Sequence, residues 1–284
     1  MVIEFAGGLL SGSLALISDS GHMLTDTGAL ALSLFALWLA RRPADSKRTF
    51  GYYRIEILAA LINGVFLWVM VLFIFREAYL RLLLPARIHV GGMMLIGALG
   101  LLVNLAGMAI LHRSQKENLN VRAAFLHVLG DALGSLGVIL AGLVILLTGW
   151  TKADPIAGIL IGVLILYSSW GLIKEAVHIL LEGSPAHIEL EEVRTSILEV
   201  GGVRGVHDLH FWTLTPKVIL LTAHVVTDFE DCDPDPLRRM IEEMLAEKYC
   251  IDHTTIQIEK EECLEEKRRM TAVRNPAAHM GHRH

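Results

Sequence analysis

The sequence has few cysteines, no long run of basic residues, and few charged residues in its first 182 positions. The three cysteines, Cys232, Cys250 and Cys263, form no CxxC pair in a chain of 284 residues, which argues against a disulfide framework and favours a reducing compartment. The net charge of −5, without a polybasic block, argues against nucleic acid as a partner. Most charged side chains fall in residues 187–270.

Long apolar stretches fill the charge-poor part of the chain, and hydrophobic residues make up 53% of the whole. A stretch longer than about 18 apolar residues is typical of a bilayer span. Five such spans are predicted, at residues 14–40, 55–75, 88–111, 123–148 and 155–181. The lipid bilayer is therefore an expected partner of this chain.

A sixth apolar segment, Val2–Leu10, stops at Ser11-Gly12-Ser13. Ten helical residues rise only about 15 Å, roughly half the hydrocarbon thickness of a bilayer. We therefore expect a truncated first helix, which about 10–20 mostly apolar residues upstream of Met1 would complete.

The basic residues of the short loops predict the orientation in the membrane. One side carries eight (Arg41, Arg42, Lys47, Arg48, Arg54, Arg113, Lys116 and Arg122) and the other four (Arg76, Arg81, Arg87 and Lys152). The positive-inside rule then places the C-terminal domain in the cytoplasm, at the inner membrane if the protein is bacterial.

Two copies of a His-x-x-x-Asp motif lie inside the predicted spans. His22 and Asp26 lie on the first, and His127 and Asp131 on the fourth. A His and an Asp four residues apart share one helix face. Two nitrogen and two oxygen ligands suit a tetrahedral Zn²⁺ site, and ionisable groups at membrane depth are usually functional.

The polar C-terminal third predicts a small α+β domain. Leu190, Val193 and Ile197 repeat at helical spacing, and residues 234–249 are amphipathic. Residues 203–214, 218–227 and 253–259 have strand character, with a hairpin signal at Thr215-Pro216. The order αββαβ suggests a sheet covered by two helices.

These features together resemble the zinc-transporting branch of the cation diffusion facilitator family, over nearly the whole chain. The resemblance is densest in Gly7–Asp26, Phe50–Asn63, Asn118–Val138, Asp154–Tyr167 and Val206–Trp212. It implies a six-helix type of membrane domain, here with its first helix truncated, and a ferredoxin-like cytoplasmic domain. The expected boundaries are 1–182 for the membrane domain, 183–188 for a linker, 189–260 for the cytoplasmic domain and 261–284 for a disordered tail.

The resemblance also implies a function. It predicts a homodimer, paired through the cytoplasmic domain, that exports Zn²⁺ from the cytoplasm in exchange for protons by alternating access. His22, Asp26, His127 and Asp131 would be the transport ligands and proton carriers, since metal loading requires deprotonated ligands. Nitrogen ligands favour Zn²⁺, with Cd²⁺ or Co²⁺ as further substrates, over Mg²⁺ or Mn²⁺. No organic cofactor is expected.

A second metal site is implied in the cytoplasmic domain. By resemblance, His207, His224, His253 and Glu259 match positions at which relatives bind regulatory zinc, with Cys263 as an additional candidate. The alternative is that some of these residues, and His210, are ordinary polar strand residues. A further metal site that some relatives carry in the loop after the second span is not expected, because Ser46, Arg48 and Tyr52 stand there.

Two other functions remain open from the sequence. An intramembrane zinc enzyme would need an open coordination position and a general base, and no HExxH motif supplies one. A metal-binding sensor or scaffold that does not transport fits the same ligands. Asp19 could line a water-filled vestibule or lie at a solvated helix end, and Asn104 could line a pathway or bond between helices.

Overall fold

The computed structural model describes residues 2–112, 119–216, 218–227 and 234–260. Its internal contacts divide the chain after Val177 into two units, whereas the sequence expectation put the boundary after Glu182. The last turn of α6 groups with the C-terminal unit, where an imidazole nitrogen of His178 lies 2.8 Å from the carbonyl oxygen of Ser184. Each unit is described by itself.

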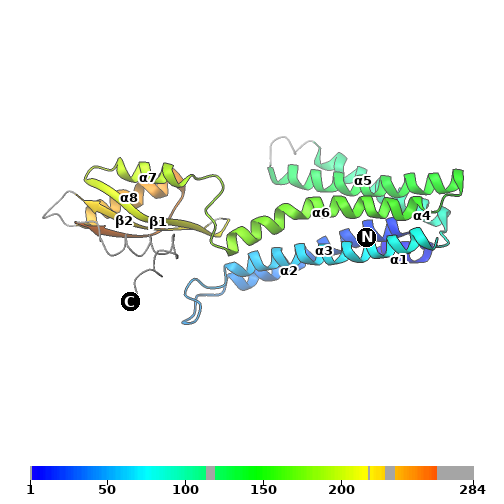
Figure 1. The fold of residues 1–284 in the computed structure, drawn as a ribbon, viewed down its shortest axis with the longest axis horizontal. Helices are drawn as coiled ribbons and strands as arrows, with labels where there is room; N and C mark the ends of the chain where they lie inside the picture. The colour runs from blue at the N-terminus through cyan, green and yellow to red at the C-terminus, as the bar shows by residue number, and fades with distance from the viewer. Residues whose placement is uncertain (1, 113–118, 217, 228–233, 261–284) are drawn as a thin grey trace, which may run out of the picture. The chain divides into compact units, whose positions relative to one another are not determined.

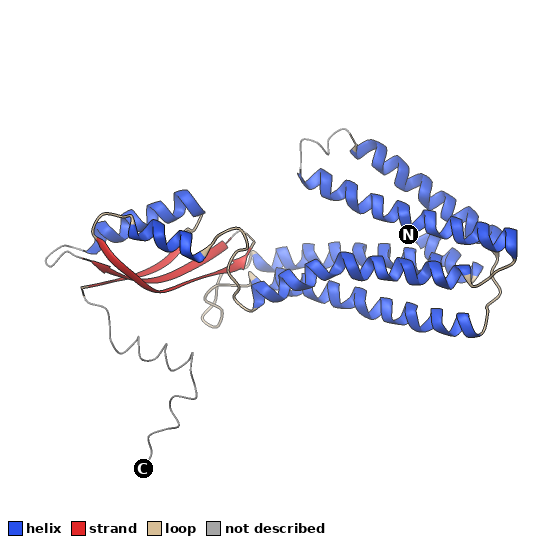
Figure 2. Cartoon of the chain, turned by 45° about the horizontal axis from the view of Figure 1, so that its top comes forward, coloured by secondary structure: helices blue, strands red, loops and turns tan. Residues whose placement is uncertain are grey.

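The first unit is helical, as predicted. A short helix, α1, precedes five helices that are long and apolar enough to cross a membrane (Figures 1 and 2). The bounds are Val2–Ser11 for α1, Leu14–Ala40 for α2, Arg54–Leu83 for α3, Val90–Leu111 for α4, Leu119–Thr148 for α5 and Ala153–Leu180 for α6. Large apolar side chains such as Phe73, Leu102 and Leu147 are exposed on the outside of this unit, as expected for a surface that faces lipid.

One helix is longer than its apolar run. The span predicted at 55–75 continues as α3 to Leu83, so Arg76 and Arg81 lie on a helix and not in a loop. Arg81 pairs through Nε with Glu77 Oε1 at 2.9 Å, one turn apart. Such i,i+4 pairs support a helix beyond the point at which its hydropathy falls.

Glycines set the close approach of α4 and α5, which run antiparallel. A side chain at Gly97 would meet Val138, and one at Gly107 would meet Val128. Residues of the two helices whose numbers add up to 235 therefore lie at the same level. On the other side of the unit, Trp68 of α3 stacks on Trp170 of α6 with ring centroids 5.5 Å apart.

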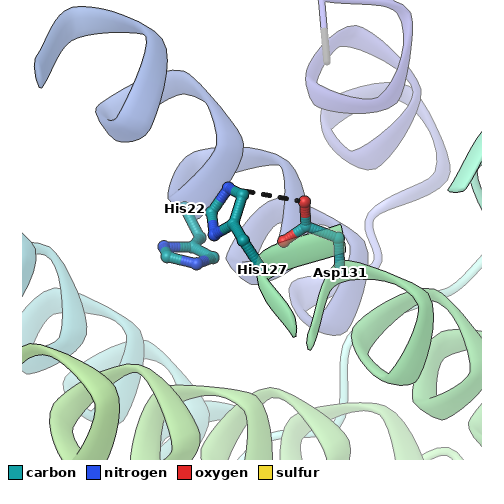
Figure 3. Close-up of side chains that lie close together, drawn as sticks. All are labelled: His22, His127 and Asp131. Atoms are coloured by element: carbon teal, nitrogen blue, oxygen red, sulfur yellow. Dashed lines mark ion pairs between the residues drawn. The ribbon is translucent and has the colours of Figure 1, made fainter. Parts of the chain in front are cut away.

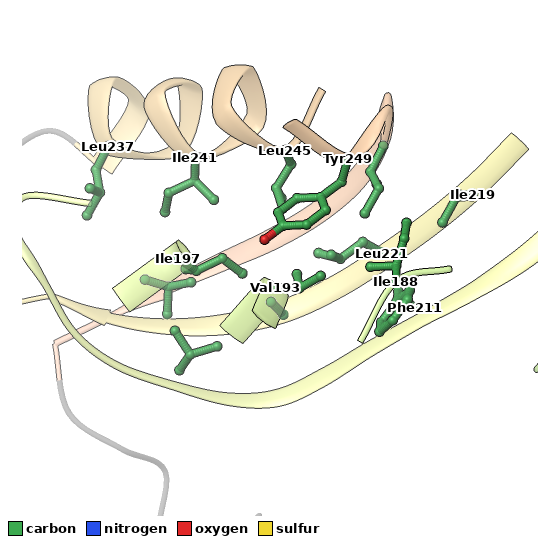
Figure 4. Packing of buried hydrophobic residues seen from close by; sticks show 14 residues of the cluster. Ile188, Val193, Ile197, Phe211, Ile219, Leu221, Leu237, Ile241, Leu245 and Tyr249 are labelled. Atoms are coloured by element: carbon green, nitrogen blue, oxygen red, sulfur yellow. The ribbon is translucent and has the colours of Figure 1, made fainter. Parts of the chain in front are cut away.

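The second unit has the predicted αββαβ order. Its elements are α7 (Leu190–Leu198), β1 (Val203–Thr215), β2 (Val218–Thr227), α8 (Pro234–Tyr249) and β3 (His253–Glu259). Strand β2 is central, antiparallel to β1 and parallel to β3, and both helices cover one face of the sheet (Figure 2). Figure 4 shows Ile241 and Leu245 of α8 pointing at Ile197 of α7 and at the sheet; all three side chains are fully buried.

Candidate metal centres

Helices α2 and α5 bring the two His-x-x-x-Asp motifs together. Figure 3 shows His22 of α2 beside His127 and Asp131 of α5. Each of these three residues has a ligand atom within 4.8 Å of those of the other two, and the two imidazole rings meet edge to face at 6.0 Å. The residues predicted from the sequence as transport ligands thus lie around one point inside the helical unit.

Asp26 completes this group from one turn along α2. Its Oδ2 lies 3.4 Å from Nε2 of His22 and 3.4 Å from Nε2 of His127. Nε2 of His127 is in turn 3.8 Å from Oδ2 of Asp131. Four tetrahedral ligands about 2.1 Å from a zinc ion are separated from one another by about 3.4 Å. The spacings from Asp26 to both imidazoles match this value, whereas His22, His127 and Asp131 are the three residues whose ligand atoms all lie within 4.8 Å of one another, so a tetrahedral set of four requires the two carboxylates to move closer together.

The polar atoms at this point are short of hydrogen-bond partners. Oδ2 of Asp26 and Nδ1 of His22 are buried and have none among the described residues. Asp131 is only 7% exposed. Buried polar atoms without partners are uncommon in native proteins, and a bound ion is one of their ordinary explanations. A cation held between these side chains would satisfy Asp26 directly.

Asp19, the other acid of α2, is neither at a solvated helix end nor exposed. It is 4% exposed, and its Oδ2 accepts a hydrogen bond of 3.1 Å from the hydroxyl of Ser135 on α5. Ser135 was not among the site residues predicted from the sequence. Its position one turn after Asp131, on the same face of α5, was the available signal.

In the C-terminal unit, one carboxylate joins three strands. Oε2 of Glu259 on β3 lies 3.0 Å from Nε2 of His207 on β1, and its Oε1 lies 2.8 Å from Nδ1 of His224 on β2. His207 and His224 are direct partners in the β1–β2 register. The amide of Gln257 donates to Oε1 of Glu259 at 2.8 Å, a positioning contact that the sequence analysis missed.

Two other residues expected at this cluster are not placed there. His253 opens β3 beside Leu220, about 20 Å along the strand from Glu259 at ~3.3 Å per residue. A strand period of two places His253 and Glu259 on the same face, but it does not specify how far apart two residues on that face lie. Cys263 lies outside the described residues. His210, the residue considered an ordinary strand residue, is exposed and lies 3.1 Å from Asp208.

The loop between α2 and α3 is organised by its own contacts. The carboxylate of Asp45 accepts hydrogen bonds of 2.8 Å from the backbone N–H groups of Lys47 and Arg48, which lower the pKa of Asp45. The Arg48 guanidinium donates to the Tyr52 hydroxyl at 2.9 Å and lies over its ring. Among the described residues, no group of three metal-ligating side chains occurs in this loop.

The helical unit with its clustered nitrogen and oxygen ligands, followed by a small α+β domain, defines a polytopic membrane protein of the metal-transporter class. Residues 1–181 match the family model of the cation efflux transmembrane domain, and residues 185–261 match that of the cation efflux protein cytoplasmic domain. The chain belongs to the cation efflux family, the cation diffusion facilitators, whose members are transporters and not enzymes. The C-terminal domain is accordingly cytoplasmic, as predicted.

Several characterised relatives align over most of their length. The cation efflux system protein CzcD of Alcaligenes sp. (strain CT14) is 46% identical over 93% of this chain and 83% of its own. The zinc transporter ZitB of Escherichia coli (strain K12) is 45% identical, over 93% and 84%. The cadmium, cobalt and zinc/H(+)-K(+) antiporter of Bacillus subtilis (strain 168) is 42% identical, over 92% and 85%.

One solved structure is also similar in sequence. It is the metal-bound C-terminal domain of the CzcD transporter from Cuprividus metallidurans, which is 42% identical and covers 25% of this chain and 99% of its own, with a TM-score of 0.24.

Proposed function

We propose that this protein exports Zn²⁺ from the cytoplasm in exchange for protons, by alternating access. His22, Asp26, His127 and Asp131 form the transport site in this proposal. The names of the relatives support the substrate class, because they include zinc transporters and an antiporter for cadmium, cobalt and zinc. Cd²⁺ and Co²⁺ are therefore proposed as further substrates.

The observation that carries the proposal is the position of Asp26. Its Oδ2 lies 3.4 Å from an imidazole nitrogen on each of two helices, without a hydrogen-bond donor among the described residues. A mixed nitrogen and oxygen set suits Zn²⁺ better than Mg²⁺, which prefers oxygen ligands alone. Half of the ligands come from α2 and half from α5, so a change in the relative position of these helices would open or close the site.

Exchange for protons follows from the chemistry of the ligands. Zn²⁺ binds neutral imidazole and ionised carboxylate, so metal loading expels protons and protonation expels the metal. Imidazole is the side chain whose ordinary titration falls in the physiological range. A proton gradient across the membrane can therefore drive the metal outward without nucleotide hydrolysis.

The cytoplasmic domain is proposed to pair two copies of the chain and to bind regulatory zinc. His207, His224 and Glu259 converge from three strands, and each offers one ligand atom within 4.8 Å of the other two. These residues fit zinc, which takes imidazole nitrogen and carboxylate oxygen together. Binding there would stabilise the sheet through all three of its strands.

Reconstitution of the purified protein in liposomes tests the transport proposal. Zinc is added outside the liposomes, and the proton concentration is made higher inside than outside or, as a control, the reverse. The expected result is zinc flux that depends on the direction of the pH difference. Zinc binding without flux would instead support a sensor or scaffold. Zinc flux that is indifferent to the pH difference would contradict exchange for protons.

A further inference from the structure

Four helices bring a second group of oxygen side chains together beside the transport ligands. Glu4 comes from α1, Asp19 from α2 and Ser135 from α5, and each of the three is at most 7% exposed. The Ser135 hydroxyl donates to Oδ2 of Asp19 at 3.1 Å. Neither Glu4 nor Asp19 is needed for the four-ligand metal site described above.

Two glycines make the space for these carboxyl groups. A side chain at Gly134 of α5 would collide with the carboxylate of Asp19. A side chain at Gly100 of α4 would collide with Oε1 of Glu4 and would approach the Ser135 hydroxyl to 3.2 Å. Glu4 and Ser135 thus both lie next to Gly100, and Ser135 also donates a hydrogen bond to Asp19.

An unsatisfied amide lies at the same place. Asn104 follows Gly100 by one turn on the buried face of α4, and it is 6% exposed. Its Nδ2 has no hydrogen-bond partner among the described residues. In the α4–α5 register, Gly100 lies level with Ser135, and Asn104 lies level with Asp131. The buried amide therefore lies at the level of the transport site, one turn from the level of Ser135.

The composition and packing of this group select its ligand. It offers carboxyl, hydroxyl and amide groups and no imidazole or thiolate, so it lacks the donors that hold Zn²⁺. Its two carboxyl groups pack against the helix backbone at Gly134 and Gly100. A carboxyl group away from water at membrane depth is costly when charged, and taking up a proton removes that cost.

The charges around Asp19 come from three helices. Glu4 faces it from α1 and Asp131 from α5, while α2 itself carries His22 one turn further on. Helix α4 contributes Gly100 and Asn104, which do not titrate. A zinc ion at the transport site would neutralise Asp131 and add positive charge nearby, which favours the ionised form of Asp19; departure of the ion would reverse the effect.

We propose that Asp19 and Glu4, with Ser135 and Asn104, form a proton-binding station distinct from the zinc ligands, which couples proton movement to the occupancy of the transport site. When zinc enters, the O–H bond of the carboxylic acid breaks and its proton passes to water; when zinc leaves, a proton from water re-forms the bond. This inference rests on the proposed function, since it assigns a carrier to the exchanged proton.

The full-length protein in liposomes tests the station. Asp19→Asn keeps the size and polarity of the side chain but cannot ionise. Zinc flux is measured with and without a pH difference, and zinc affinity is measured by calorimetry on the same preparation. Ser20→Ala is the matched control, because Ser20 is a buried residue of the same helix that bonds to its own backbone at Leu16.

The expected result is that Asp19→Asn still binds zinc, with the affinity of the proton-loaded protein and a weaker dependence of that affinity on pH, and that it loses the acceleration of flux by the pH difference, while Ser20→Ala keeps both properties. An Asp19→Asn protein that still responds to the pH difference would overturn the station. Complete loss of zinc binding at every pH in this variant would also overturn it, because Asp19 would then belong to the metal site. Unmodified protein without any pH response would instead refute the proposed function.

A second variant covers the case in which Asp19→Asn does not fold. Ser135→Ala keeps both carboxyl groups and removes only the hydroxyl that donates to Asp19. Because a donor stabilises the ionised carboxylate, its loss is expected to move the pH of half-maximal zinc flux upward. An unchanged pH profile in folded Ser135→Ala would contradict the role given to Asp19.

Discussion

The carboxylate of Asp154, at the start of α6, accepts a hydrogen bond of 2.5 Å from the hydroxyl of Ser13, the residue that caps α2. The same carboxylate accepts from the backbone N–H groups of Leu14 at 2.7 Å and Ala15 at 3.2 Å. These are N–H groups of the first turn of α2, which have no partner within their own helix. Asp154 is completely buried, so α6 supplies a fixed anchor for the helix that carries His22 and Asp26.

Replacement of Asp154 by alanine is expected to destabilise the membrane unit. Several buried donors would lose their acceptor together, and each unsatisfied buried donor costs about 1–3 kcal/mol. The expected result is a clearly lower melting temperature of the detergent-solubilised protein. The melting temperature of Asp154→Asn, which retains one acceptor oxygen, should lie between those of the unmodified protein and Asp154→Ala. An unchanged melting temperature for Asp154→Ala would show that the anchor is dispensable.

Loss of one transport ligand should cripple zinc flux without preventing membrane insertion. Asp26→Ala removes the oxygen that approaches both imidazoles, and we expect zinc affinity to fall by roughly 100-fold or more, since even outer-shell changes at metal sites cost 10–100-fold. Calorimetry and liposome flux measure the two effects. Thr27→Ala is the matched control because the Thr27 hydroxyl bonds to its own helix at Met23. Normal flux in Asp26→Ala would refute the four-ligand site.

The choice between metals should depend on His22. Replacing this nitrogen ligand by a harder oxygen ligand in His22→Asp is expected to relax the discrimination of Zn²⁺ from Mn²⁺, while Cd²⁺, a softer ion, should gain nothing from the change. The measurement is the ratio of fluxes for the three metals in the same liposomes. A variant with reduced flux but an unchanged ratio would mean that selectivity is set elsewhere.

Much of the site could be predicted because the spacing of residues within each helix determines which side chains share a face. Two His-x-x-x-Asp motifs inside apolar spans determine which helix faces carry the ligands, and the structure brings those faces together. The contact of Ser135 with Asp19 could not be predicted in this way. It depends on the level at which α5 packs against α2 and on the space at Gly134, neither of which leaves a periodic pattern in the sequence.

The cytoplasmic domain shows the same limit. The spacing of apolar residues predicted the αββαβ order. It did not distinguish Glu259, which meets His207 and His224, from His253, at the other end of the same strand. Hydropathy likewise located α3 but ended it too early, because the pair of Glu77 and Arg81 extends the helix beyond its apolar run.

Zinc should stabilise the cytoplasmic domain through His224 and not through His253. A ligand that binds only the folded state at 100 times its dissociation constant adds about 2.7 kcal/mol. For a fragment of residues 178–260, we therefore expect micromolar zinc to raise the melting temperature.

His224→Ala should remove most of this gain, because it deletes a nitrogen that lies 2.8 Å from Glu259. His253→Ala is the matched control: it removes an imidazole from the same sheet, at a position apart from the cluster, and should leave the gain unchanged. Equal losses in the two variants would contradict the three-residue site, whereas an unchanged melting temperature in the unmodified fragment would confine zinc to the membrane unit.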